Sequence, residues 1–249
     1  MAILKVNALT KYFGGVAALK DVSFEIPEKR ICGFIGPNGA GKTTLFSLIT
    51  GAIRPSVGRV QLRGRDVTGM SSSSLVRMGI ARTHQIVRPF RAMTVLENVQ
   101  LAVHFGRQGI GSTSHAKDKA LEALKLVHLD PKAHLLASVL SLGEQKRLEV
   151  ARALATSPDL LLLDEVCGGL AASETAEMLE LLQQIRARGA TIMCVEHDMK
   201  AVMSVCDRIT VLNFGQKLAE GRPEEIQNNE QVIEAYLGKA NLGNGFGIL

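Results

Sequence analysis

The feature that most constrains the fold is the stretch GPNGAGKTT at residues 36–44. It matches the phosphate-binding pattern G-x-x-x-x-G-K-[ST] at every specified position. A short apolar run at residues 30–35 predicts a buried strand before it, and residues 42–50 predict a helix that begins within it. Glycines let the backbone curl around phosphate oxygens, and a helix N-terminus adds partial positive charge. A Gly-rich turn without a ligand is the alternative, but strand, loop and helix together predict a nucleoside triphosphate site.

The side chains of this loop predict how the triphosphate and its metal are held. Lys42 is expected to pair with the β- and γ-phosphates, and the Thr43 hydroxyl to ligate Mg²⁺. Thr44 follows one residue later and is the weaker candidate for a ligand. We expect the backbone around the phosphates to come from six residues: Gly36, Pro37, Asn38, Gly39, Ala40 and Gly41.

Composition limits the class of protein. The chain has 249 residues, 46% of them hydrophobic and only 4% aromatic, which predicts one large domain, or a domain with an insertion, around an aliphatic core. No apolar run approaches the ~18 residues of a membrane span, and no signal-peptide pattern is present, so we expect a soluble intracellular protein. The net charge is +5, but the basic residues are dispersed with few aromatics among them, which argues against nucleic acid and is compatible with lipid headgroups nearby. Scattered cysteines without a C-x-x-C pair predict buried thiols rather than disulfides or a zinc site.

Near the N-terminus, alternating runs at residues 3–8 and 18–26 predict two strands joined by a turn at residues 12–15. Tyr12 and Phe13 precede the glycines of that turn. Either aromatic ring could fill the core, which is its commoner role, or stack on a nucleotide base. The sequence alone favours the core.

Residues 90–155 have a different character, because helical periodicity dominates there. Three helices are predicted at residues 94–105, 115–127 and 143–155, which indicates a small helical subdomain inserted into an α/β core. Further strands are expected at residues 58–63, 79–85, 160–163, 190–195, 208–212 and 217–220, further helices at 174–188 and 231–237, and a loop with a helix cap at 70–77.

Polar residues follow two of the buried strands. Asp164 and Glu165 come directly after four leucines, and in phosphate-loop proteins an Asp at this place helps to hold Mg²⁺. Glu165 could then orient or deprotonate the attacking water, whereas the alternative is an ordinary acidic turn. His197 follows the strand at residues 190–195, so we expect it near the edge of the sheet where ligands bind, although a lone His is more often structural. Gln85, after another strand, means little by itself.

Taken together, residues 4–238 resemble the ATP-binding subunit of an ABC transporter. The diagnostic stretch is LSLGEQKRL at residues 140–148, which is similar to the LSGGQ signature. The resemblance implies an α/β fold with a RecA-like P-loop NTPase core, an N-terminal antiparallel β-subdomain and an inserted α-helical subdomain at about 90–155. It implies a single ABC ATP-binding domain at residues 1–238 and a C-terminal tail at 239–249.

The resemblance also implies roles for individual residues in binding ATP and Mg²⁺ and in hydrolysis. Phe13 stacks on adenine, Gln85 contacts Mg²⁺ and the water, and His197 contacts the γ-phosphate. Glu165 is catalytic, and Asp164 and Thr43 hold the metal. Ser141 and Gly143 meet the γ-phosphate of an ATP bound to a second ATP-binding subunit in a head-to-tail dimer.

Segments in the C-terminal part of the chain indicate which group of ABC transporters it resembles. VEHDM at 195–199, AEGRP at 219–223 and VIEAYLG at 232–238 resemble the branched-chain amino acid (Liv-type) importers, although urea and amide importers share much of this pattern. The resemblance implies a peripheral protein on the cytoplasmic face of the membrane. Its partners would be permease subunits, a second ATP-binding subunit, identical or not, and indirectly an external solute-binding protein. A soluble ABC ATPase outside transport and a non-hydrolysing regulatory subunit remain alternatives.

The chain departs from the family pattern at several positions. Leu142 replaces a signature glycine, Glu144 a Gln and Val166 a Pro, while no polar side chain is present at the position that usually carries Asp or Asn after the catalytic strand. That last departure puts communication across the dimer in doubt. The residue at that position is Ala171; Ala172 stands where Pro is common, and His84 stands before the Q-loop Gln where Phe is common.

Overall fold

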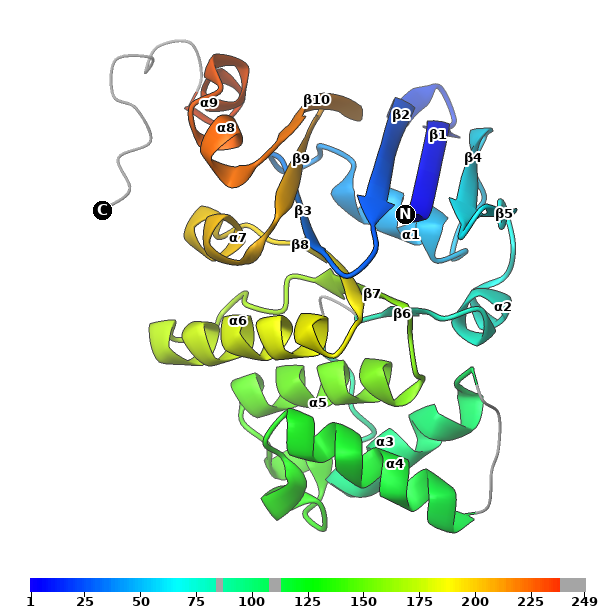
Figure 1. Cartoon of the computed structure of the whole chain (residues 1–249), viewed down its shortest axis with the longest axis vertical. Coiled ribbons are helices and arrows are strands. Elements are labelled where there is room, and N and C mark those ends of the chain that lie inside the picture. Colours follow the sequence, from blue (N-terminus) through cyan, green and yellow to red (C-terminus); the bar gives the residue numbers. More distant parts are fainter. Residues whose placement is uncertain (84–86, 108–112, 238–249) are drawn as a thin grey trace. The chain divides into compact units, whose positions relative to one another are not determined.

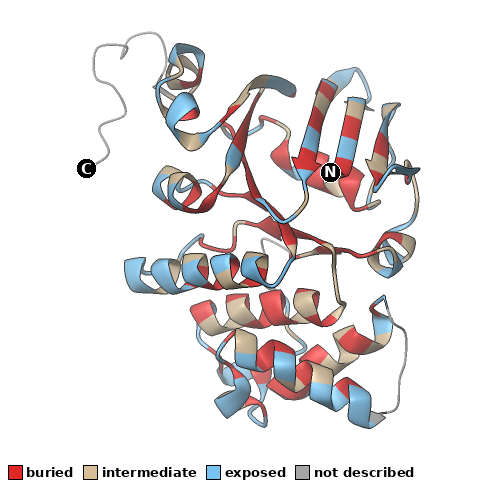
Figure 2. Cartoon of the chain, in the orientation of Figure 1, coloured by how far each residue is buried: buried red, intermediate tan, exposed pale blue. Residues whose placement is uncertain are grey.

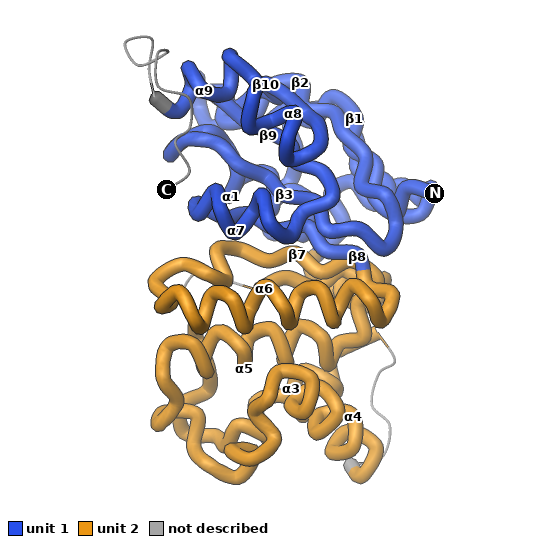
Figure 3. Tube along the Cα trace, turned by 60° about the vertical axis from the view of Figure 1, so that its left-hand side comes forward, with its two compact units in different colours: residues 1–71, 191–249 blue, residues 72–190 orange. Residues whose placement is uncertain are grey.

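The computed structural model describes residues 1–83, 87–107 and 113–237 (Figure 1). The chain divides into two compact units, one formed by Met1–Ser71 with Thr191–Leu249 and the other by Ser72–Ala190 (Figure 3). No helix in the described residues is long and apolar enough to cross a membrane.

The first unit begins with an antiparallel sheet. β1 (Ala2–Phe13) pairs with β2 (Val16–Pro27) on one side and with β4 (Val57–Leu62) on the other, and β5 (Arg65–Asp66) completes the order β2-β1-β4-β5. Buried and exposed residues alternate along β1 and β2, as expected for strands with one face on the core (Figure 2). The predicted N-terminal hairpin is confirmed, with longer strands than the sequence suggested.

A second set of strands in this unit carries the phosphate loop. β3 (Ile31–Ile35) lies parallel to β8 (Thr191–Val195) and to β9 (Arg208–Asn213), and β10 (Gln216–Gly221) pairs antiparallel with β9. Every residue of β3 and β8 is buried (Figure 2). Four helices complete the unit: α1 (Lys42–Ile49), α7 (Met199–Val205), α8 (Pro223–Gln227) and α9 (Glu230–Leu237).

The second unit has two short parallel strands and a group of helices. β6 (Ile80–Arg82) pairs with β7 (Leu160–Asp164), and all of β7 is buried. α3 (Val95–Phe105), α4 (Thr113–Leu126) and α5 (Leu142–Ala155) contact one another within the predicted helical insertion. The remaining elements are α2 (Ser72–Arg77), α6 (Ala172–Ala187) and the 3₁₀ turns η1 (Asp130–Lys132) and η2 (Ala137–Val139).

The structure differs from the sequence predictions mainly at short elements. Residues 72–77 form a helix where we expected a loop with a helix cap, and α7 and α8 were not predicted at all. These helices span 6, 7 and 5 residues, too few for an apolar periodicity of 3.6 to show.

The four cysteines are buried, as predicted. The Sγ atoms of Cys194 and Cys206 lie 3.6 Å apart, well beyond the ~2.05 Å of a disulfide bond. Burial raises the pKa of the Cys32 thiol to about 12. These thiols therefore act as small apolar side chains of the core.

Candidate functional site

The phosphate loop connects β3 to α1, as predicted, and tight backbone packing explains its glycines. A Cβ on Gly36 would lie 2.2 Å from the carbonyl oxygen of Leu212, and one on Gly41 would lie 2.7 Å from that of Ala18. Gly41 also has a φ of 100°, in the left-handed region that favours glycine. Neither position can hold a side chain without moving a neighbouring strand.

Lys42 holds the loop together in this structure. Its side chain is 7% exposed, and its Nζ donates hydrogen bonds to the carbonyl oxygens of Gly36 (2.5 Å) and Pro37 (2.9 Å). The ammonium group is therefore enclosed by the loop that is expected to receive the phosphates. The Thr43 side chain is exposed and that of Thr44 is half-buried at the same helix end.

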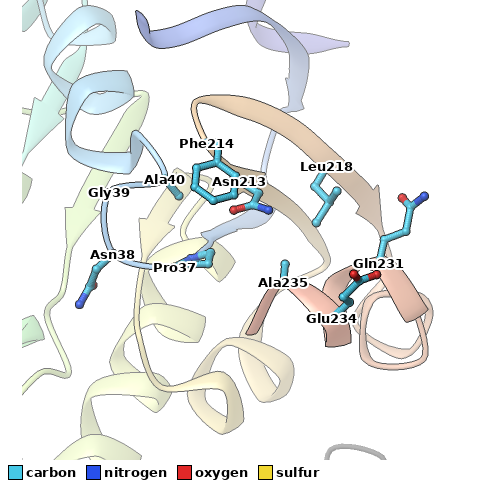
Figure 4. Close-up of a pocket in the computed structure, with 10 residues that line it drawn as sticks. All are labelled: Pro37, Asn38, Gly39, Ala40, Asn213, Phe214, Leu218, Gln231, Glu234 and Ala235. Atoms are coloured by element: carbon cyan, nitrogen blue, oxygen red, sulfur yellow. The ribbon is translucent and has the colours of Figure 1, made fainter. Parts of the chain in front are cut away.

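A cavity of about 580 Å³ borders the loop (Figure 4). Besides the loop, its walls come from the β9–β10 hairpin and from α9, whose residues our sequence analysis did not assign to the site. The Tyr236 hydroxyl on α9 is hydrogen-bonded to the backbone of Gly36, and burial raises its pKa to about 12. The lining residues are Pro37, Asn38, Gly39, Ala40, Asn213, Phe214, Leu218, Gln231, Glu234 and Ala235.

The aromatic residues before the first turn do not fill the core. Tyr12 is 47% exposed and Phe13 is 52% exposed, so the commoner of the two roles is wrong for both. The Nζ of Lys11 lies 5.1 Å from the centre of the Phe13 ring, a cation–π contact that leaves much of the ring accessible. Base stacking by Phe13 stays a prediction.

His197 lies two residues beyond β8, at the strand end where we expected it, and its side chain is exposed. The next residue, Asp198, caps α7 by accepting hydrogen bonds from the N–H groups of Lys200 and Ala201. His197, Phe13 and the phosphate loop all belong to the first unit.

Asp164 ends β7 in the second unit and is 3% exposed. Arg82, the last residue of β6, donates a hydrogen bond from Nη2 to Asp164 Oδ2 at 2.6 Å. The Asp164 N–H donates to the Thr83 hydroxyl oxygen at 3.1 Å. Our sequence analysis missed Arg82, although a charged residue at the end of a short apolar strand is a signal that could have drawn attention to it.

Glu165 has a backbone conformation that is uncommon for a residue with a side chain. Its φ is 53°, in the left-handed region, and its side chain is half-buried. Its carbonyl oxygen accepts hydrogen bonds from Lys146 Nζ (2.7 Å) and from the Gly168 N–H (3.3 Å). Glu165, whose carboxylate is predicted to be catalytic, therefore lies in a tight turn directly after a buried strand, and its carbonyl oxygen accepts two hydrogen bonds.

The signature stretch forms the start of α5. Ser141 is its N-cap: the Ser141 hydroxyl accepts from the Glu144 N–H, and the Glu144 carboxylate accepts from the Ser141 N–H. Glutamate and glutamine can both form such a capping box, so the Glu at position 144 is compatible with a capped helix start. A Cβ on Gly143 would lie 2.5 Å from Glu174 Oε1, so a side chain at this position would have to displace the Glu174 carboxylate.

Two electrostatic effects oppose each other at Glu144. Burial raises its pKa, but hydrogen bonds from Lys132 and from the Ser141 N–H, with the positive charges of Lys132 and Arg147, outweigh burial and lower the pKa below its ordinary value. The start of α5 is thus stabilised by an ionised carboxylate, which also complements the helix dipole.

Some predicted positions have a plain structural description, and others lie outside the described residues. Val166 is buried, and Ala171 is the N-cap of α6 without a polar side chain, its N–H donating instead to the Glu174 carboxylate. Gln85 and His84 lie outside the described residues, as does the predicted tail at 239–249.

Comparison with known proteins identifies the class. The family model for ABC transporters matches residues 19–168, more than half of the chain, and the model for branched-chain amino acid ATP-binding cassette transporters matches residues 216–240. The chain is 45% identical to the high-affinity branched-chain amino acid transport ATP-binding protein LivG of Salmonella typhimurium, over 96% of this chain and 98% of LivG.

Solved structures agree with this assignment. The ADP conformation of MJ1267, an ATP-binding cassette of an ABC transporter, matches with a TM-score of 0.87 and 31% identity over 96% of this chain and all of that one. The dimeric post-hydrolysis structure of the cassette MJ0796 bound to ADP and Pi matches with a TM-score of 0.80 and 29% identity, over 88% and 98% of the two chains. The chain therefore belongs to the ABC transporter family, as an ATP-binding subunit with ATPase activity. The predicted α/β ABC ATPase fold is confirmed.

Proposed function

We propose that this chain is the ATP-hydrolysing subunit of an importer for branched-chain or other hydrophobic amino acids. The observation that carries the proposal is the 45% identity with LivG, which extends over nearly the whole of both chains. The match of residues 216–240 to the branched-chain model adds a second, C-terminal segment to the argument.

Each part of the site has a role in this proposal. Lys42 and the backbone N–H groups of the phosphate loop bind the β- and γ-phosphates, and Phe13 stacks on adenine. Glu165 positions the attacking water, and His197 contacts the γ-phosphate. Gln85, which lies outside the described residues, keeps its predicted role at Mg²⁺ and the water.

The donors present suit Mg²⁺. Thr43 offers an exposed hydroxyl and Asp164 a carboxylate, and oxygen donors of this kind are what Mg²⁺ prefers, with phosphate oxygens and water as its other ligands. No group of three or more His, Cys, Asp or Glu side chains among the described residues could hold a metal ion by itself. We infer that the metal arrives with the nucleotide and neutralises charge on the phosphoryl group.

A second subunit completes the site. Ser141 and Gly143 lie at the N-terminus of α5, where a helix presents N–H groups and partial positive charge. We infer that they bind the γ-phosphate of ATP held by a second ATP-binding subunit, so that nucleotide binding drives closure of a head-to-tail dimer. MJ0796, a similar cassette, has been solved as a dimer.

The remaining partners follow from the transport function. We propose that permease subunits receive the movement of the helical segment at residues 90–155, that the chain lies against the cytoplasmic face of the membrane, and that a solute-binding protein acts indirectly. The predicted organisation, one ABC domain at 1–238 with a tail at 239–249, is part of the same proposal.

Affinity purification from detergent-solubilised membranes of the source cells tests this function, with an untagged strain as the control. We expect two multi-span permeases and a second ATP-binding subunit to co-purify, and the purified complex to hydrolyse ATP faster when a branched-chain amino acid and its binding protein are added. Stimulation by urea or a short amide instead would assign the related importer group. Recovery from the soluble fraction with DNA or ribosomal proteins would refute a role in transport.

A further inference from the structure

Lys146 on α5 is a buried cation beside the predicted catalytic residues. Its side chain is 6% exposed, although lysine is rarely buried without a partner that compensates its charge. Its Nζ donates to the Glu165 carbonyl oxygen at 2.7 Å. The same ammonium lies 3.7 Å from where a Cβ on Gly168 would be, an ordinary van der Waals distance, so Lys146 is close to the turn that follows Glu165.

The surroundings of Lys146 are acidic and enclosed. A cavity of about 10 Å³, close to the size needed for one water molecule, is lined by Lys146, Glu149, Asp164 and Glu165 together with Thr83, Val87 and Val166. Glu149 is paired with Arg152, whose Nη1 lies 2.5 Å from its Oε1. The hydrogen bond of Lys146 is directed at the peptide group of Glu165.

The backbone conformation at Glu165 determines the direction in which its side chain, and therefore its carboxylate, extends. The left-handed φ of 53° is disfavoured for a residue with a Cβ, so the surrounding structure must hold it. Two hydrogen bonds to the same carbonyl oxygen do so, one from the Gly168 N–H within the turn and one from Lys146 on another element. The bond from Lys146 is charge-assisted and is therefore the stronger of the two.

We propose that Lys146 is a positioning residue for the catalytic carboxylate of Glu165. It ties the peptide at Glu165 to the signature helix, so that the helix that carries Ser141 and Gly143 also determines the direction of the carboxylate in its own subunit. The inference rests on the proposed function, because it requires that Glu165 positions the attacking water.

Substitution of Lys146 in the full chain tests the proposal. Lys146→Met preserves much of the side-chain length but removes the donor, and we expect kcat for ATP hydrolysis to fall by about 10- to 100-fold, as for other residues that orient a functional ligand. KM should change by less than about two-fold, because the phosphate loop is untouched. Lys146→Gln keeps an N–H donor and should recover most of the rate. Lys125→Met, an exposed lysine on α4, is the matched control and should keep wild-type turnover.

A double-mutant cycle with Glu165→Gln distinguishes positioning from a general structural effect. Glu165→Gln alone should slow hydrolysis by about 10²- to 10⁴-fold while ATP still binds. If Lys146 acts through Glu165, adding Lys146→Met should slow single-turnover hydrolysis no further. If the fold losses in rate of the two single variants multiply in the double variant, or if Lys146→Met has wild-type kcat, the inference is overturned and the proposed function is left intact. Wild-type turnover of Glu165→Gln would instead refute the catalytic role of Glu165 itself.

Amide hydrogen exchange gives a readout that does not depend on turnover. In Lys146→Met we expect faster exchange of the Gly168 N–H, which shares its acceptor with Lys146, and unchanged exchange within α5. If the Met variant does not fold, Lys146→Gln and Lys146→Arg can be carried through the same cycle. Unchanged exchange at Gly168 in Lys146→Met would contradict the proposal.

Discussion

The pair of Arg82 and Asp164 allows a quantitative prediction for stability. Arg82 is 12% exposed and Asp164 3% exposed, with 2.6 Å between Nη2 and Oδ2. Removing one partner of a buried ion pair leaves an uncompensated charge, which costs about 3–5 kcal/mol. We therefore expect Arg82→Met to lower the free energy of unfolding by about that amount. At roughly 2–4 °C per kcal/mol for a chain of this size, Tm should fall by about 6–20 °C.

Urea unfolding followed by circular dichroism, without nucleotide or metal, measures this loss. Arg208→Met is the matched control, because Arg208 is 50% exposed in its pair with Glu220 and exposed pairs contribute only about 0.2–1 kcal/mol. Adding Asp164→Asn to Arg82→Met should restore much of the stability, since the buried charge is then gone. A loss in Arg82→Met no larger than in Arg208→Met would refute the reasoning.

Two further predictions concern the phosphate loop and the signature helix. Gly36→Ala should weaken ATP binding by at least about ten-fold, roughly 1.4 kcal/mol, because its Cβ would lie 2.2 Å from a backbone carbonyl oxygen. Gly39→Ala is the comparison: φ is positive at both glycines (79° at Gly39 and 156° at Gly36), so both alanines strain the backbone, but the Cβ at Gly39 meets no atom within 4 Å and this variant should lose less. Equal losses in a fluorescent-nucleotide titration would contradict the packing argument. The lowered pKa of Glu144 means that its stabilisation is complete above its ordinary pKa of 4.5 and is lost as pH falls through the lower value in the folded state. Thermal melts between pH 3 and 6 should therefore show that Tm falls less steeply with decreasing pH in Glu144→Gln than in wild type. Equal dependence of Tm on pH in the two proteins would show that the Glu144 carboxylate does not contribute to stability.

Most of the fold could be predicted from sequence because its longer elements have clear periodicity. The buried runs at β3, β7 and β8 and the capped helices α3 and α5 follow ordinary rules of burial and capping. β1 was predicted too short because its pairing with β2 shifts register several times between Ala2 and Tyr12. A β-bulge places an extra residue in one strand, so a test for strict alternation ends there although the strand continues.

The features of the candidate site also fall into two groups, those that the sequence could predict and those that it could not. The phosphate loop could be predicted because a motif specifies its spacing, and Asp164 and Glu165 could be predicted because they follow four leucines that indicate a buried strand. The contacts of Arg82, Lys146 and Tyr236 could not be predicted, because each reaches the site from another element: Arg82 at Asp164, Lys146 at Glu165 and Tyr236 at the loop. Such contacts depend on how strands and helices come together, and no local pattern records them.

These contacts also bear on how the site works. Asp164 and Glu165 are adjacent carboxylates, and each is held by a cation from a different element, Arg82 through a side-chain oxygen and Lys146 through a backbone carbonyl. Arg82 therefore orients a carboxylate oxygen of Asp164, and Lys146 holds the backbone from which the Glu165 carboxylate extends. Groups that are oriented in advance cost little reorganisation when charge develops on a substrate, and this is where most electrostatic catalysis arises. The two hydrogen bonds differ in what the proposed function requires of them: if Asp164 ligates Mg²⁺ as proposed, one of its oxygens would have to become available to the metal, whereas the Glu165 carbonyl could stay bonded to Lys146. Under that proposal, the bound metal would compete with Arg82 for the Asp164 carboxylate, while the hydrogen bond from Lys146 to Glu165 could persist.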